Sequence, residues 1–159
     1  MNGNGNLPDS VLAPILGGQL RKDAAAAWNA MCFEAGLRGL PIPTPDGSES
    51  SYRTFAQQVE LRNYWCGQGN CSNAAVPGSS NHGLGIAVDC TQNDPARHRA
   101  TVDVIGAKFG WGSAGSDAPW EEWHMKWQPV WHGPDPGPYG APVLIDIPDD
   151  PQMITAVSR

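Results

Sequence analysis

The chain has 159 residues, of which 16% are charged, and its formal net charge is −6. This acidic balance argues against a nucleic-acid partner, because no excess of Lys and Arg is available to neutralise phosphates. No apolar run approaches the roughly 20 residues that span a bilayer, so membrane insertion is not expected either. The length suits one domain with a core of its own, and we expect a monomer.

The two ends of the chain differ in composition from its middle. The first residues are rich in Gly and Asn, and we expect an irregular lead-in over residues 1–19. They have neither the basic nor the apolar region of a secretory signal, which predicts synthesis in the cytoplasm without a signal peptide. Residues 132–159 are rich in Pro and Gly and predict a C-terminal extension, with a candidate edge strand over residues 143–147.

Helices are predicted in three segments, residues 19–37, 54–64 and 95–109. In the first, apolar residues recur at steps of three and four, and the run Ala24–Ala27 has the highest helix propensity. Thr54 is a suitable N-cap for the second, and Pro95 suits the first turn of the third. His98 in the third helix has an arginine on each side, so we expect its side chain to be solvated.

Short strands are predicted in three further segments, residues 50–53, 85–91 and 123–127. Residues 85–91 alternate small and apolar side chains, which is typical of a buried strand. Residues 111–120 have the composition of a polar loop. Because helices and short strands mix without the regular alternation of βαβ units, the chain is predicted to be α+β.

Four cysteines leave the redox state of the protein open. Cys66 and Cys71 lie five residues apart in a loop rich in Gly and Asn. They could close a small disulfide, or they could form half of a thiolate metal site, although no second cysteine pair exists to complete one. Cys32 and Cys90 are expected to be small, buried, apolar residues.

One segment in the middle of the chain combines an imidazole with a carboxylate. Six residues separate His82 from Asp89, and they include Gly83 and Gly85. These glycines predict a turn, so that His82 would approach a site from a loop and Asp89 from a strand. Alone, this pair is only a weak sign of a metal site.

A second segment, Glu121-Glu122-Trp123-His124, adds another imidazole with carboxylates beside it. Tryptophans surround these ionisable groups, and buried charges need a partner or a metal. Two histidines and an aspartate, with a spare carboxylate, are the inventory of a catalytic rather than a structural zinc site. The residues by themselves therefore favour a metallohydrolase with Zn²⁺ as its cofactor.

Together the segments resemble the VanY-like D-alanyl-D-alanine carboxypeptidases and the related peptidoglycan peptidase domains of bacteriophage endolysins. The resemblance covers about residues 20–130 and rests on three motifs in order, Tyr52-Arg53-Thr54-x-x-x-Gln58, Ser80-x-His82-x-x-Gly85-x-Ala87-x-Asp89 and Glu121-x-Trp123-His124. It implies a zinc peptidase domain over residues 20–131, in which helices and a small antiparallel sheet surround a zinc cleft. It also implies three zinc ligands: His82, Asp89 and His124.

The resemblance further implies roles for the residues around the metal. Glu121 would be the general base, although the adjacent Glu122 is a competing carboxylate. Arg53 would meet the oxygen of the scissile carbonyl. Ser80 and Tyr52 are candidates for contacts with the substrate.

The implied function is hydrolysis of a bond in the peptidoglycan stem peptide, as by a D-Ala-D-Ala carboxypeptidase. A phage or prophage lysis enzyme, released to the cell wall by a holin, would need no signal peptide. Two alternatives stay open, an L-Ala-D-Glu endopeptidase of the same family and a non-catalytic cell-wall-binding relative. A zinc amidase with Cys90 as a ligand is disfavoured, because on a strand Cys90 would face away from its neighbour Asp89.

Overall fold

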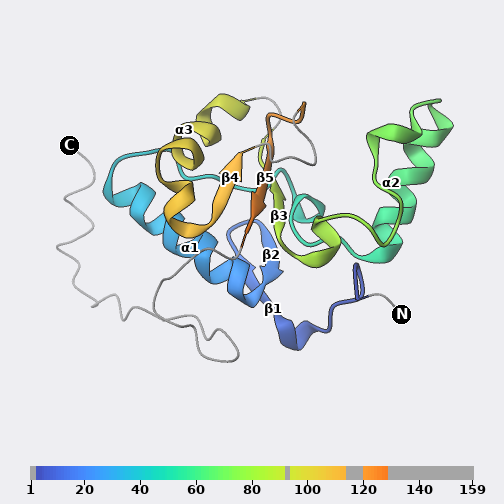
Figure 1. Cartoon of the computed structure of the whole chain (residues 1–159), viewed down its shortest axis with the longest axis horizontal. Coiled ribbons are helices and arrows are strands. Elements are labelled where there is room, and N and C mark those ends of the chain that lie inside the picture. The colour runs from blue at the N-terminus through green and yellow to red at the C-terminus, as the bar shows by residue number, and fades with distance from the viewer. Residues whose placement is uncertain (1–2, 92–93, 114–119, 129–159) are drawn as a thin grey trace.

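The computed structural model describes residues 3–91, 94–113 and 120–128. They form three α-helices, a two-stranded sheet and a three-stranded sheet, which confirms the α+β class. Figure 1 shows the larger sheet in the middle, with α1 (Lys22–Leu37) and α3 (Pro95–Ile105) on one side and α2 (Phe55–Gly67) on the other. None of the helices in these ranges is long and apolar enough to cross a membrane.

The first two strands form a hairpin that the sequence did not predict. β1 (Leu12–Ile15) pairs antiparallel with β2 (Gly18–Arg21), and α1 follows directly. Residues 12–19 are thus part of an ordered hairpin rather than of an irregular lead-in. Pro14 argued against a strand in the sequence, because proline is tolerated in a strand only where its missing N–H is not needed, as at a sheet edge.

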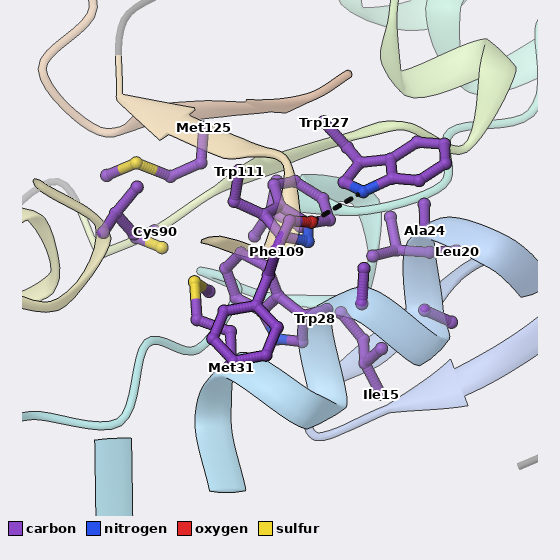
Figure 2. Packing of buried hydrophobic residues seen from close by; sticks show 14 of the residues in the cluster. Ile15, Leu20, Ala24, Trp28, Met31, Cys90, Phe109, Trp111, Met125 and Trp127 are labelled. Atoms are coloured by element: carbon purple, nitrogen blue, oxygen red, sulfur yellow. Dashed lines mark hydrogen bonds between the residues drawn. The ribbon is translucent and has the colours of Figure 1, made fainter. Parts of the chain in front are cut away.

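α1 supplies the centre of the hydrophobic core. Trp28 on this helix is completely buried and meets Trp111 edge to face, with ring centroids 4.6 Å apart. Figure 2 shows this pair among the packed side chains, together with the hydrogen bond of 3.0 Å that Trp127 Nε1 donates to the carbonyl oxygen of Phe109. The indole nitrogen of Trp127 is therefore satisfied inside an otherwise apolar cluster.

A three-stranded antiparallel sheet covers this core. In pairing order its strands are β3 (Ala87–Asp89), β5 (His124–Trp127) and β4 (Trp111–Ser113). Successive side chains of a strand point to opposite faces. Val88 and Met125 enter the core, so their neighbours Asp89 and His124 face the other way. One face of the sheet thus closes the core and the other is available for a site.

α2 is joined to the rest of the protein mainly by polar contacts. Thr54 is its N-cap, as predicted, and forms a capping box with Gln57. Gln58 is the one buried residue of this helix, and no side chain of α2 belongs to the hydrophobic core of the described residues. At its end Cys66 and Cys71 form a disulfide, which settles the choice between the two interpretations of this pair.

Three further predictions of local structure are wrong. Residues 50–53 form no strand, because a 3₁₀ turn (Ser48–Ser50) leads into bends there. Residues 111–113 form β4 instead of a loop. His98 is 5% exposed instead of solvated, since it shares the inward face of α3 with Val102 and Ile105. Burial and, after it, the charge of the neighbouring arginine lower the pKa of His98.

The third predicted helix spans α3 and a following 3₁₀ turn (Gly106–Phe109). Asp94 caps α3 by accepting a hydrogen bond from the backbone N–H of Arg97, and Pro95 lies in the first turn as expected. The C-terminal extension over residues 132–159 and its candidate edge strand lie outside the described residues and stay predictions.

Candidate metal centre

The register of the central sheet brings two of the three predicted ligands together. Asp89 on β3 lies directly opposite His124 on β5. Side chains at such positions start about 4.5–5.5 Å apart, and His124 Nδ1 is 2.8 Å from Asp89 Oδ1. A slip of the register by one residue would turn one strand's ligand into the core, so the pairing of the strands fixes this contact.

His82 comes from a tight turn just before β3. Residues His82–Leu84 form a 3₁₀ turn that ends at Gly85, whose φ of 65° is one that residues with a side chain rarely adopt. A Cβ at Gly85 would also lie 2.7 Å from the backbone nitrogen of Arg21. The turn brings His82 Nε2 to 3.2 Å from Asp89 Oδ2, so Gly85 is needed for the approach of the second imidazole.

A hydrogen bond fixes the orientation of the His82 ring. His82 Nδ1 lies 2.9 Å from the carbonyl oxygen of Ser51, and both groups are buried. Because a carbonyl oxygen can only accept, Nδ1 carries a proton and donates it. Histidines that bind metals commonly use one ring nitrogen in this way and leave the other for the ion. Nε2 is therefore the atom that His82 directs to the site.

The three side chains form a set that fits a metal ion. One potential ligand atom from each of His82, Asp89 and His124 lies within 4.8 Å of the other two. Two imidazole nitrogens and a carboxylate oxygen suit zinc and leave a position open for water or substrate. Cys90, the alternative ligand of an amidase, is buried in the core on the other face of the sheet.

The charge of Asp89 is set by its surroundings. Burial alone would raise the pKa of this carboxyl group, but attraction to the imidazoles of His82 and His124 overcomes that effect. The pKa of Asp89 is consequently well below its ordinary value. Asp89 is therefore present as a carboxylate, which is the form that binds a cation.

The N-terminal segment supports the His82 turn from behind. Asn4 Nδ2 donates to the carbonyl oxygen of Ser80 at 2.8 Å, and the amide of Gly5 donates to that of Gly83 at 2.7 Å. Gln58 Nε2 completes the arrangement by donating to Asn4 Oδ1 at 3.1 Å. No motif marked Asn4, because its partner Ser80 lies 76 residues away in the chain.

A cleft of about 820 Å³ opens above the three ligands. Its size is within the range of ligand pockets in enzymes. Segments that are distant in sequence line it, namely residues 46–50, 72–75 and 79–82, Leu61 and Trp65 of α2, and the segment that contains Trp120 and Trp123. His82, Asp89 and His124 also line this cleft, so the metal set is accessible from it.

The two adjacent glutamates point in different directions. Glu121 lines the cleft, and its Oε2 lies 3.8 Å from His124 Nδ1. Burial and, after it, the neighbouring Asp89 carboxylate raise the pKa of Glu121. Glu122 is exposed, and its Oε1 lies 3.7 Å from Nη1 of Arg99 on α3. Of the two carboxylates, Glu121 is the one placed beside the metal set.

Arg53 reaches the cleft beside Asp89. Its Nε donates to the carbonyl oxygen of Glu49 at 3.0 Å, and its Nη2 lies 3.5 Å from Asp89 Oδ2. The backbone of Arg53 is held by a hydrogen bond of 3.2 Å from its N–H to the carbonyl oxygen of His82. These contacts direct a fixed positive charge to the metal set.

The two candidates for substrate contacts are placed differently. Ser80 lines the cleft, and its hydroxyl accepts a hydrogen bond of 3.3 Å from the backbone N–H of His82. Tyr52 lies outside the cleft, where its hydroxyl accepts a hydrogen bond of 2.9 Å from the backbone N–H of Leu7. The structure therefore does not bring Tyr52 to the site. Tyr52 instead holds the N-terminal segment through this hydrogen bond.

Comparison with known proteins identifies the family. Residues 17–109 match the sequence model of the family described as VanY, D-alanyl-D-alanine carboxypeptidase, and this match spans more than half of the chain. The chain belongs to this family. The match ends before Glu121 and His124. The pairing of β5 with β3 brings this later part of the chain next to the matched residues. No curated protein sequence matches the chain.

Solved structures share the VanY fold with this chain. The D,D-pentapeptidase VanY from a VanB-type resistance cassette, solved with Zn(II), is 20% identical over 76% of this chain and 81% of that one, with a TM-score of 0.53. VanYB in complex with D-alanine-D-alanine is 22% identical over 73% and 76%, also at 0.53. The LD-carboxypeptidase LdcB is 19% identical over 77% and 70%, at 0.56. At such identities the likeness concerns the fold.

Replacing Gly83 by Ala is expected to destabilise the protein through the support of the metal turn. A Cβ at this position would lie 1.9 Å from Asn4 Oδ1 and 2.2 Å from Gln58 Nε2, so a buried hydrogen bond has to move. We expect the free energy of unfolding to fall by about 1–3 kcal/mol, measured by urea denaturation. Gly112→Ala is the matched control, because a Cβ there meets nothing within 4 Å. Equal stability of the two variants would contradict this role of Gly83.

Proposed function

We propose that the protein is a zinc-dependent peptidase that hydrolyses a bond of the peptidoglycan stem peptide, in the manner of a D-Ala-D-Ala carboxypeptidase. The observation that carries this proposal is the set of His82, Asp89 and His124 in a cleft that Glu121 and Arg53 also line. Membership of the VanY family supports the substrate class. The presence of Zn(II) in one solved relative and of D-alanine-D-alanine in another agrees with it.

The chemistry assigns a proton-transfer role to Glu121. A zinc ion held by the three ligands would supply an activated water and polarise the scissile carbonyl. Glu121 is assigned to accept a proton from the attacking water and to deliver it to the leaving amine, and its position in the lining of the cleft supports this role. Its raised pKa suits both steps, because a general acid–base works best when its pKa is close to the operating pH.

Arg53 completes the site with a positive charge. Hydrolysis of an amide develops negative charge on the carbonyl oxygen, and a donor that is already oriented stabilises that charge. Contacts with Glu49 and Asp89 hold the guanidinium of Arg53 before any substrate arrives. We assign it the stabilisation of this oxygen. Ser80, on the wall of the cleft, is proposed to contact the substrate backbone.

Cleavage of defined muropeptides tests the proposed function. Purified protein with zinc is expected to release the terminal D-alanine of a pentapeptide stem, detected by mass spectrometry. A chelator should abolish the reaction, and added zinc should restore it, because the water and the carbonyl both depend on the ion. Cleavage between L-Ala and D-Glu would indicate the endopeptidase instead. Zinc-loaded protein that binds muropeptides without cleaving them would contradict an enzymatic role.

Exchanging the adjacent glutamates for glutamine separates their roles. Glu121→Gln should keep zinc but lose on the order of 10²–10⁴ in kcat, the usual contribution of a general acid–base. Glu122→Gln is the matched control, because this side chain points to Arg99 and should leave the rate unchanged. Both variants are compared by kcat and by zinc content. Loss of activity in Glu122→Gln alone would contradict the assignment.

Removing the guanidinium of Arg53 should slow the chemical step. By analogy with the loss of one oxyanion donor, Arg53→Ala is expected to cost on the order of 10²–10³ in kcat. Arg99→Ala serves as a control, since Arg99 carries the same charge outside the cleft. Steady-state kinetics on the zinc-loaded variants provide the measurement, and unchanged kcat in Arg53→Ala would rule out this role.

The biological setting stays a prediction. A phage or prophage lysis enzyme that acts on the cell wall after release by a holin agrees with a peptidoglycan substrate, and the VanY family match is silent on it. Lysis of cells from outside by the purified protein, compared with Glu121→Gln, would support this setting.

A further inference from the structure

One wall of the cleft is built by a segment that the hydrophobic core does not reach. Residues 72–75 line the cleft together with Leu61 and Trp65 of α2. No described side chain between residues 55 and 79 belongs to the core cluster. Figure 1 shows α2 and the loop that follows it projecting away from α1 and α3. Contacts other than core packing must therefore set the position of this wall.

Arg62 ties this wall to α2. Its Nη1 donates to the carbonyl oxygen of Cys71 at 2.7 Å and also to that of Ala74. Both acceptors are backbone groups, so one guanidinium fixes the path of the chain at two points three residues apart. Hydrogen bonds from a charged donor are roughly twice as strong as neutral ones. The two hydrogen bonds of Arg62 thus hold residues 71–74 against α2.

Three anchors lie on one face of α2. The Cys66–Cys71 disulfide is one, and Arg62 is the second. Gln58 is the third, since its Oε1 accepts a hydrogen bond of 2.8 Å from the backbone N–H of Gly78. Positions 58, 62 and 66 are four residues apart, and residues at this spacing share one side of a helix. The helix therefore holds the segment from residue 71 to residue 78 along its whole length.

We propose that Arg62 and the Cys66–Cys71 disulfide are positioning groups for substrate binding, which hold residues 71–75 as the wall against which the stem peptide packs. The proposal rests on the proposed function and deepens it. The metal ligands are carried by the sheet and by the His82 turn, which have their own supports in the core and the N-terminal segment. A loosened wall is therefore expected to weaken substrate binding and to leave the chemical step intact.

Substitutions at Arg62 test the proposal. Arg62→Met keeps an unbranched, flexible side chain but removes both hydrogen bonds, and should raise KM on the order of tenfold with kcat within about threefold. Arg62→Lys keeps a charged donor, and its KM should lie close to that of the unmodified protein. Glu60→Gln, an exposed position on the same helix, is the control. Gln58 is not used, because it also supports the metal turn through Asn4.

The double variant Cys66→Ser/Cys71→Ser tests the disulfide independently. This variant is used instead of treatment with a thiol reductant, because the thiolates of the reductant would themselves bind zinc. The same rise in KM is expected, and zinc content should stay that of the unmodified protein. Unchanged KM in both this variant and Arg62→Met would overturn the proposal, as would a fall in kcat alone or a loss of zinc.

Hydrogen exchange separates this proposal from the proposed function. In Arg62→Met, amides of residues 70–78 should exchange faster while those of residues 86–89 keep their rates, whatever the activity of the protein. Equal exchange in the variant and the unmodified protein would overturn the positioning role. Faster exchange in a protein that cleaves no muropeptide would instead contradict the proposed function alone.

Discussion

The pairing of β3 with β5 is the constraint on which the site depends. It sets Asp89 opposite His124 on one face of the sheet and Val88 opposite Met125 on the other. The buried pair packs among the tryptophans of the core, so core packing and ligand placement are satisfied by the same register. A shift of one residue would move a charged group into the apolar cluster, where an unpaired charge is very costly. Folding of the core therefore brings together two of the three candidate metal ligands.

The position of the third candidate ligand, His82, depends on polar contacts from segments far away in sequence. The carbonyl oxygen of Ser51 orients the His82 ring, and Asn4 holds the turn on which His82 lies. Each of these hydrogen bonds is modest in free energy, but leaving buried partners unsatisfied would cost more than the bond itself contributes. The N-terminal segment is thereby part of the site, although it contributes no ligand.

The cleft combines supports of different kinds. Two of the three candidate ligands, Asp89 and His124, are carried by strands that close the hydrophobic core, and His82 is carried by the turn before β3. The outer wall of the cleft is carried by α2, which has no side chain in that core. Regions with few buried apolar contacts open at lower free energy than the core does. This division leaves the reacting groups fixed while the wall that meets the peptide depends on Arg62 and on a disulfide.

Local patterns were enough to predict what depends on neighbours in sequence. Helical spacing and caps gave the three helices, and the strand that carries Asp89 followed from the alternation of small and apolar residues. The three motifs that carry the family resemblance named His82, Asp89 and His124, and the structure brings these side chains together. The fold class followed from the same elements.

The predictions that failed concern residues whose partners are remote in the chain. The direction of Tyr52 is set by Leu7, and the burial of His98 by the packing of α3, neither of which a motif records. The strand that contains Pro14 was not predicted, because the sequence alone does not show that this residue lies at a sheet edge. The sequence had favoured Glu121 over Glu122, and the contact of Glu122 with Arg99 on α3 agrees with that choice.

X-ray absorption at the zinc edge tests the metal centre most directly. For protein loaded with one equivalent of zinc, the structure predicts a first shell of nitrogen and oxygen only, at about 2.0–2.1 Å, with outer-shell scattering from two imidazole rings. Asp89→Asn should weaken the binding and keep the two imidazoles. A sulfur shell at about 2.3 Å, or a single imidazole, would contradict a site made by His82, Asp89 and His124.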